Sequence, residues 1–142
     1  MTEPRDLSPQ DYEHLLAFRT SLRKFLHWSE ARAREAGLTP AQYQVLVAIK
    51  GHGRPPTIGD LAGYLLLRHH STVELIDRAE DAGLVNRTGD IEDGRVIRIT
   101  LTEFGEEKLH QLAPSHLDEL RRLAPILDEL VAGALSGPST GV

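Results

Sequence analysis

The fold is decided by the stretch from Thr57 to Thr102, TIGDLAGYLLLRHHSTVELIDRAEDAGLVNRTGDIEDGRVIRITLT. Thr57 and Asp60 have the spacing of a capping box, and apolar residues follow them at helical spacing. A second helical pattern starts at the polar run 68–72 and ends at Gly83, where a left-handed cap can close it. The stretch therefore begins with two short helices.

Two β-strand patterns follow the second helix. Leu84 and Val85 begin one strand, and the alternating β-branched residues from Val96 to Leu101 form the other. The polar segment 88–94 between them predicts a turn that projects into solvent. The order helix, turn, helix, strand, turn, strand is that of a winged helix-turn-helix.

Three sequence blocks resemble the MarR-type transcriptional regulators. They are S-T-V-x-L-x-D-R at 71–78, G-L-V-x-R at 83–87 and D-G-R-V-x-x-x-x-L-T-x-x-G at 93–105. Their order and spacing carry the likeness, which extends with the flanking helices over nearly the whole chain. The resemblance implies a mainly α (α+β) fold with about six helices and a two- to three-stranded wing.

Long helical patterns flank this module. Pro9 starts the first one with a broad apolar stripe, and leucines at helical spacing mark the last one, which contains Pro114 and Pro125. Because proline removes a backbone donor and clashes with the preceding turn, we expect a kink near Pro114 and a helix break near Pro125.

The first helix is expected to span about 28 residues, or roughly 40 Å, which exceeds what a small core can cover. The resemblance implies that the first and last helices of two subunits interlock, so we expect a homodimer. A monomeric bundle that buries both stripes against its own core is the alternative.

The length of 142 residues fits a single domain, 1–142. Within it we expect dimerisation helices at 8–36 and 103–136, a winged helix-turn-helix part at 38–102, and loose tails at Met1–Leu7 and in the terminal GPSTGV. The lack of cysteine excludes disulfides and thiolate sites. No apolar run approaches the roughly 18 residues of a membrane span, and the N-terminus lacks signal-peptide features, so we expect a cytoplasmic protein without a membrane partner.

The net charge of -5 has the wrong sign for binding DNA by bulk electrostatics. Even the span from Arg68 to Arg98 holds five arginines and seven acidic residues. Any DNA contact must therefore depend on local geometry, with arginines facing phosphates and acids turned away or paired.

The resemblance implies DNA contacts at the start of the second helix of the motif and on the wing. A helix-turn-helix presents this helix end to base edges, and backbone N–H groups and hydroxyls there bind phosphate. The DNA-binding candidates are Arg68, His69, His70, Ser71, Thr72, Glu74, Arg78, Asp93 and Arg95. Of these, we expect His70, Ser71, Thr72 and Glu74 to enter the major groove.

Several candidates have two interpretations. Glu74 either accepts a hydrogen bond from a cytosine amino group or faces solvent. Arg78 either binds the DNA backbone or pairs with Glu74 at i, i+4. Arg95 matches the wing arginine of the family, which lies in or beside the minor groove, and Asp93 matches the aspartate that braces the wing.

The resemblance also implies a small, aromatic and anionic effector. The candidates to line its site are His14, Arg19, Arg23, His27 and Trp28; the alternative is that they are core aromatics and solvated cations. No histidine pair has H-x-x-x-H spacing, so we expect no metal and no cofactor. We found no nucleophile elbow or phosphate loop, and the acidic residues Asp90, Glu92 and Asp93 are typical of a solvated turn, so we expect no enzyme activity.

Taken together, the sequence predicts a homodimeric DNA-binding transcriptional regulator that recognises a pseudo-palindromic operator in double-stranded DNA. We expect a repressor that a small ligand releases. The alternative is a winged-helix module for protein contacts or ligand binding, without DNA recognition.

Overall fold

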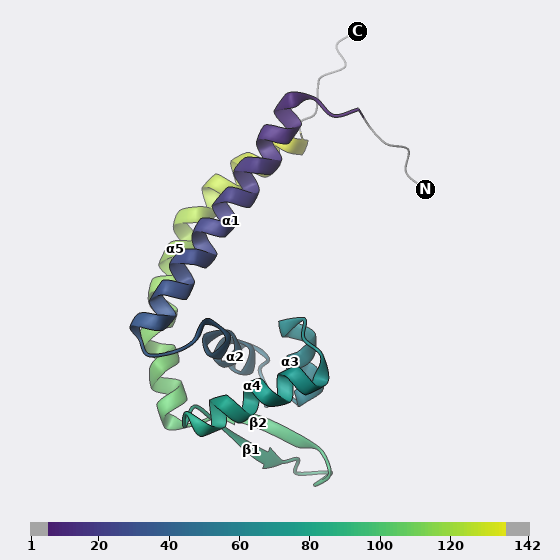
Figure 1. Cartoon of the computed structure of the whole chain (residues 1–142), viewed down its shortest axis with the longest axis vertical. Coiled ribbons are helices and arrows are strands. Elements are labelled where there is room, and N and C mark those ends of the chain that lie inside the picture. Colours follow the sequence, from purple (N-terminus) through teal and green to yellow (C-terminus); the bar gives the residue numbers. More distant parts are fainter. Residues whose placement is uncertain (1–5, 136–142) are drawn as a thin grey trace. The chain divides into compact units, whose positions relative to one another are not determined.

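The computed structural model describes residues 6–135 (Figure 1), so the residues at both ends where we expect tails lie largely outside it. Five helices and two strands lie within this range. They are α1 (Pro9–Glu35), α2 (Pro40–Gly51), α3 (Ile58–Leu65), α4 (His69–Asp81), β1 (Val85–Gly89), β2 (Ile97–Leu101) and α5 (Glu103–Leu135). The mainly helical winged helix-turn-helix fold is confirmed, with five helices where about six were expected.

The difference in helix number comes from α5. This helix continues through both Pro114 and Pro125, so the expected break near Pro125 is wrong. Both prolines are exposed, whereas Leu112 and Leu123 on the same helix are buried. The apolar contacts of the buried side maintain the helix although each proline removes one backbone donor on the solvent side. The kink near Pro114 stays a prediction.

The chain divides into two compact units. The winged unit is Glu30–Pro114, and the helical unit comprises the described residues 6–29 and 115–135. Both α1 and α5 contribute to each unit. None of the helices within residues 6–135 combines the length and apolar character that crossing a bilayer requires.

Side-chain caps fix the helix starts in the winged unit. In the capping box of α3, Thr57 Oγ1 accepts the Asp60 N–H at 3.1 Å and Asp60 Oδ2 accepts the Thr57 N–H at 3.0 Å. Thr39 and Gln42 form the same pair of bonds at α2. Gly83 takes the predicted left-handed conformation after α4, with φ of 76°. In contrast, α3 ends at a left-handed leucine, Leu66, with φ of 55° and an exposed side chain.

The core of the winged unit is formed by every element of the motif. Its largest fully buried side chains are Leu46 of α2, Leu61 of α3, Ile76 of α4, Leu84, and Ile99 of β2. These contacts pack α4 against both the first helix of the motif and the wing, and they fix its orientation within the unit.

The wing is an antiparallel hairpin whose register pairs Val85 with Leu101 and Gly89 with Ile97. The second strand of the hairpin, β2, also contacts the segment before α3. The Ile99 N–H donates to the Pro56 carbonyl at 2.8 Å, and Thr57 and Arg98 form an isolated bridge. The wing is thereby hydrogen-bonded to the start of the helix-turn-helix.

In the helical unit, α1 and α5 lie side by side (Figure 1). An aromatic cluster joins them: the ring of His116 lies 4.9 Å from that of Trp28 and 6.4 Å, edge-on, from that of Phe25. The buried His116 also shares a 2.7 Å hydrogen bond with Ser29 Oγ through its Nε2. Many larger apolar side chains of this unit remain exposed.

Gly105 provides a test of the packing between α5 and the wing. A Cβ at this position would lie 2.2 Å from the Leu84 carbonyl oxygen, which itself accepts the Thr102 N–H at 3.0 Å. We expect Gly105→Ala to lower the free energy of unfolding by at least about 2 kcal/mol, because only backbone movement can relieve the clash.

Gly63→Ala is the matched control, because Gly63 is an exposed α3 residue with open space at its Cβ position. This variant should gain about 0.5 to 1 kcal/mol in helix propensity. Urea denaturation of both variants measures the effects, and equal stability of Gly105→Ala and wild type would contradict the described packing.

Candidate nucleic-acid interface

The N-terminus of α4 is open to solvent. Arg68 is the N-cap residue and provides no side-chain cap, and the side chains of Arg68, His69 and His70 are all exposed. The N–H groups of a first helical turn carry partial positive charge and bind anions. This helix end therefore presents donors and a cation to the same space.

Thr72 does not face this space. It is fully buried, and its hydroxyl donates to the Arg68 carbonyl at 2.9 Å, within the first turn of α4. Threonine commonly makes this bond to the carbonyl four residues earlier, which satisfies the hydroxyl inside the helix. Thr72 thus stabilises the helix start, whereas the preceding Ser71 is half-buried. We therefore leave Thr72 out of the proposed DNA contacts.

Glu74 and Arg78 lie on the exposed side of α4. The i, i+4 ion pair considered for them does not form, and no other ion pair involves either side chain within residues 6–135. The same is true of Arg68 in that range. Arg68 and Arg78 are therefore the cations of this helix that remain available to an external phosphate.

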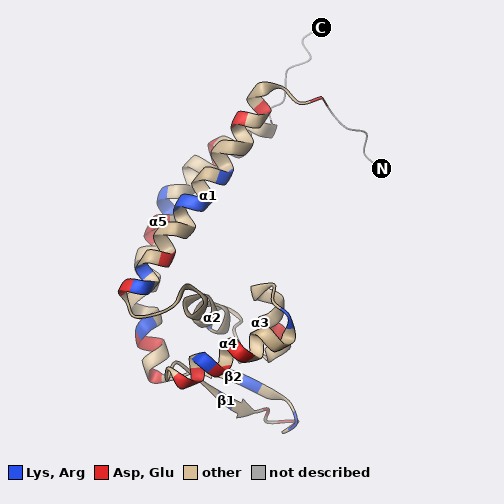
Figure 2. Ribbon diagram, viewed as in Figure 1, with Lys and Arg blue, Asp and Glu red and all other residues tan. Residues whose placement is uncertain are grey.

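Two other acidic residues of α4 are neutralised by one arginine of β1. The guanidinium of Arg87 contacts Asp77 Oδ1 at 2.5 Å and Glu80 Oε1 at 2.9 Å. Figure 2 shows that acidic and basic residues lie close together along α4 and the wing. The expectation that acids near the motif are paired is confirmed for these two residues.

The wing arginine is highly exposed but its orientation is defined. The Arg95 side chain is 92% exposed, and Asp93 Oδ1 accepts both its backbone N–H and its Nε at 3.1 Å. These bonds, led by that of the Arg95 side chain, hold the pKa of Asp93 below its usual value. Asp93 therefore braces Arg95, as the resemblance implied.

Asp90 and Arg98 form an ion pair that the sequence analysis missed. Asp90 Oδ1 accepts Arg98 Nε at 2.6 Å, and both side chains are only about one-fifth exposed. The sequence pattern indicates a solvated turn for Asp90, Glu92 and Asp93 alike, whereas Asp90 and Asp93 each pair with an arginine. Because Asp90 lies beyond the last ladder pair of the hairpin, its partner could not be deduced from strand alternation.

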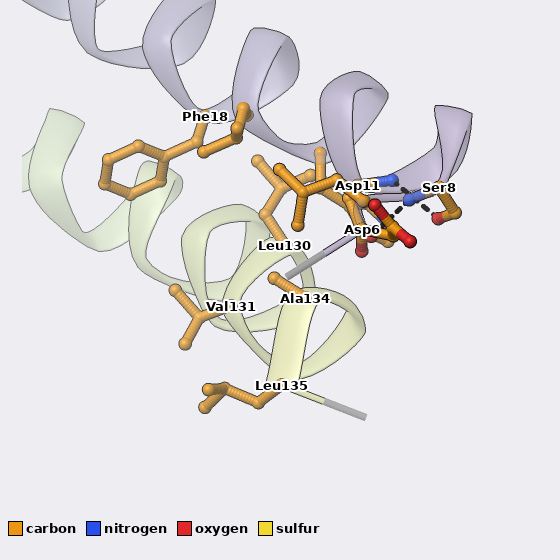
Figure 3. Close-up of a pocket in the computed structure, with 11 residues that line it drawn as sticks. Asp6, Ser8, Asp11, Phe18, Leu130, Val131, Ala134 and Leu135 are labelled. Atoms are coloured by element: carbon orange, nitrogen blue, oxygen red, sulfur yellow. Dashed lines mark hydrogen bonds between the residues drawn. The ribbon is translucent and has the colours of Figure 1, made fainter. Parts of the chain in front are cut away.

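The five effector-site candidates do not come together in the helical unit. His14 is half-buried and lines a cavity of about 460 Å³, which Figure 3 shows between the start of α1 and the end of α5. Arg19, Arg23 and His27 are exposed and do not line it, while Trp28 packs against His116.

The chemistry of this cavity does not suit an anion. Most of its lining is apolar: Leu7, Leu15, Phe18, Leu130, Val131, Ala134 and Leu135. Its charged lining groups are the carboxylates of Asp6 and Asp11, and the latter accepts the Ser8 N–H at 2.8 Å. Within the part of the chain that the structure describes, no three His, Asp or Glu side chains lie close enough together to hold a metal.

Comparisons with known proteins agree with this geometry. Residues 36–96 match the sequence model described as the MarR family. The chain is also 31% identical over 119 residues to the uncharacterised HTH-type transcriptional regulator YsmB of Bacillus subtilis, a match that covers 81% of each protein. The chain belongs to the MarR family of transcriptional regulators. It is accordingly a winged-helix DNA-binding protein, and the relatives named here are regulators rather than enzymes.

Two further similarities fit this MarR-family assignment. The HTH-type transcriptional repressor MdtR of Bacillus subtilis is 30% identical over 93 residues, which cover 66% of this chain and 59% of MdtR. The crystal structure of AbsC, a MarR family transcriptional regulator from Streptomyces coelicolor, superposes with a TM-score of 0.71 at 26% identity. That match covers 91% of this chain and 99% of AbsC.

The ion pairs of the wing predict a pH effect. The hydrogen bond from Arg98 is the main reason why the pKa of Asp90 lies below the usual 3.8. Because the folded-state pKa is depressed, the ionised carboxylate stabilises the fold above pH about 3.9, and this contribution is lost as the pH falls through the folded-state pKa.

We therefore expect carbon-detected NMR titration to give Asp90 a midpoint below 3.8 that rises toward this value in Arg98→Met. Arg95→Met should instead raise the midpoint of Asp93. If the Asp90 midpoint is the same with and without Arg98, the described pairing is incorrect.

Proposed function

We propose that this MarR-family protein is a homodimeric repressor that binds a pseudo-palindromic operator through the N-terminus of α4 and the wing. The observation that carries the proposal is the open first turn of α4, where Arg68, His69 and His70 are exposed, while Asp77 and Glu80 further along the helix are paired with Arg87. Bulk attraction is not needed if the unpaired cations and N–H groups face the phosphates.

The DNA face, as we define it, comprises the exposed or half-exposed candidates of α4 and the wing: Arg68, His69, His70, Ser71, Glu74, Arg78 and Arg95. Arg68 and Arg78 would bind phosphates on either side of the major groove, and His70 and Ser71 would contact base edges or phosphate. Glu74 would accept a hydrogen bond from a cytosine amino group, since no cation within residues 6–135 occupies its carboxylate. Arg95 would contact the minor groove, braced by Asp93.

Dimerisation is supported by the surface of the helical unit. Eleven of the eighteen exposed large apolar residues within the described range belong to this unit, although it holds only about a third of the described residues. Tyr12, Leu16 and Leu135 are 60%, 66% and 80% exposed. A second copy of α1 and α5 would cover this surface and the apolar cavity of Figure 3. Twofold symmetry would then present two DNA faces to the two halves of an operator.

Repression and its release by a ligand complete the proposal. A small aromatic anion that binds better to a dimer unable to fit the operator would lower DNA affinity by that difference in binding energy. Arg19 and Arg23 of α1 are exposed and have no ion-pair partner within residues 6–135, so they can bind a carboxylate. Loss of DNA binding on addition of aromatic acids, measured together with a promoter–reporter assay, tests this part.

The DNA-binding proposal predicts a salt-dependent interaction with the protein's own promoter fragment. Between about 50 and 200 mM salt, fluorescence anisotropy should give a linear dependence of log affinity on log salt concentration. Arg95→Ala should weaken binding and reduce the slope by about 1, as expected for one lost phosphate contact.

Arg121→Ala is the control, because Arg121 is also a largely exposed arginine, lies in the helical unit and pairs with Asp118. It should leave both quantities unchanged. If Arg95→Ala and Ser71→Ala bind like wild type, the DNA face is misassigned. In that event, a winged-helix module for protein contacts becomes the better interpretation.

The dimer proposal predicts that a charge in the apolar surface of α1 separates the subunits. Leu16→Glu should convert the protein from dimer to monomer in size-exclusion chromatography with light scattering, because a buried unpaired carboxylate is costly. Leu66→Glu introduces the same charge at a 91% exposed residue of the winged unit and should leave the dimer intact. A monomeric wild-type protein at micromolar concentration would rule the proposal out.

A further inference from the structure

One carboxylate organises the tip of the wing, which we define as residues 90–95. Asp90 follows the last residue of β1, and its two oxygens accept different groups. Oδ1 accepts Arg98 Nε at 2.6 Å, while Oδ2 accepts the backbone N–H groups of Glu92 at 3.1 Å and Asp93 at 3.0 Å. The Asp90 N–H itself donates to the Val96 carbonyl at 2.8 Å, which closes the hairpin beneath the tip.

Arg98 connects this carboxylate to the helix-turn-helix. Its Nη1 donates to the Pro55 carbonyl at 2.9 Å, just before the N-cap residue of α3, and its backbone bridges to Thr57. Among the ion pairs within residues 6–135, Arg98 and Asp90 form the one in which both side chains are less than one-quarter exposed. The wing tip is therefore attached to the start of α3 through a largely desolvated pair.

The same carboxylate reaches the wing arginine in one further step. Asp90 binds the N–H of Asp93, and Asp93 in turn binds the backbone and side chain of Arg95. The contacts thus run without interruption from Pro55 through Arg98, Asp90 and Asp93 to Arg95. Any loosening at Asp90 would release the residue that orients Arg95.

We propose that Asp90 is a positioning residue for DNA binding, which holds Arg95 at the height and orientation that its minor-groove contact requires. The inference rests on the DNA face proposed above. It explains why a carboxylate is present in a turn that approaches a polyanion. The turn is ordered before DNA arrives, so binding does not have to bear the entropy of ordering it.

Only a carboxylate fits the observed contacts. Asp90 uses both oxygens as acceptors, for a guanidinium on one side and two amides on the other. Asparagine has the same shape but a single acceptor oxygen, so its NH₂ group would face donors on one of the two sides. Asp90→Asn therefore breaks the connection while removing one negative charge.

The test compares Asp90→Asn with Glu92→Gln in the promoter-fragment anisotropy assay. Both variants remove one negative charge from the same turn, and Glu92 is exposed and forms no ion pair within the described range. Electrostatics alone predicts tighter binding for both variants. The positioning role predicts tighter binding only for Glu92→Gln, and binding about threefold to tenfold weaker for Asp90→Asn. Equal or tighter binding by Asp90→Asn would overturn the inference.

A double-mutant cycle with Arg95→Ala tests whether Asp90 affects DNA affinity through Arg95. If Asp90 acts through Arg95, Asp90→Asn should weaken binding in the wild-type background and leave Arg95→Ala unchanged. It should also reduce the salt slope by about 1, as Arg95→Ala does. An equal weakening in both backgrounds would show that Asp90 does not act through Arg95.

Arg98→Lys is a second variant that breaks the same connection, so the inference stays testable if Asp90→Asn misfolds. Lysine keeps the positive charge but lacks the planar fork that binds Asp90 and the Pro55 carbonyl together, so the same Arg95-dependent weakening is expected. Circular dichroism checks that both variants keep their helices. If the wild type shows no salt-dependent binding, both the proposed function and this inference fail. If it binds and neither variant is weakened, the inference alone fails.

Discussion

The winged unit depends on the pairing of its own acidic residues, because a chain with a net charge of -5 belongs to a family that binds a polyanion. A carboxylate beside a phosphate is repelled unless a nearby cation compensates for it. Arg87 neutralises two carboxylates of α4, and Arg95 and Arg98 each bind one carboxylate of the wing. The pairs of Arg87 also connect β1 to α4, and Arg98 connects the wing tip to the segment before α3 through its hydrogen bond to the Pro55 carbonyl. The same arginines thus neutralise the carboxylates of the winged unit and hold its elements together.

In the proposed function, this arrangement would affect selectivity as well as affinity. Few cations of the motif are unpaired, so attraction to arbitrary DNA would contribute little, and non-specific binding is the part of affinity that depends most on such attraction. A regulator must distinguish its operator from a large excess of other sites, so the ratio of the two affinities matters more than either one. An acidic chain that binds through a small, geometrically defined set of donors would favour a high ratio over a high affinity for all DNA.

Local signals in the sequence predicted much of the fold. The capping box at Thr57 and the left-handed Gly83 follow from short-range hydrogen bonding and backbone conformation, so they are found in the structure as expected. The failures concern long-range context. Thr72 is a polar residue in a polar segment, which suggested a surface contact, but its side chain lies in the core. Helix α5 continues through Pro125 because the side of the helix opposite the proline is packed.

For the candidate site, the motif blocks predicted which helix end and which wing residues are candidates for DNA contact. The sequence could not indicate how the charges are paired. Arg87 binds residues seven and ten positions earlier, and Arg98 binds a residue eight positions earlier. In all three pairs the carboxylate lies outside the strand that carries the arginine, so neither helix nor strand periodicity predicts the contact. Assigning cations to DNA therefore requires separating arginines that are largely buried against internal carboxylates, such as Arg87 and Arg98, from one that stays exposed although it is paired, such as Arg95.

The two units differ in how completely they bury their own apolar residues. Leu46, Leu61, Ile76 and Ile99 give the winged unit a closed core formed by its own elements, whereas most of the large exposed apolar residues lie on the smaller helical unit. In the proposed dimer, the DNA face would therefore be formed independently of the partner, while the stability of the helical unit would depend on protein concentration. An effector that changes the pairing of helices could then alter the spacing of two DNA faces without altering either face. Regulation and DNA recognition would then be separable in the same chain, because regulation would act through the helical unit and recognition through the winged unit.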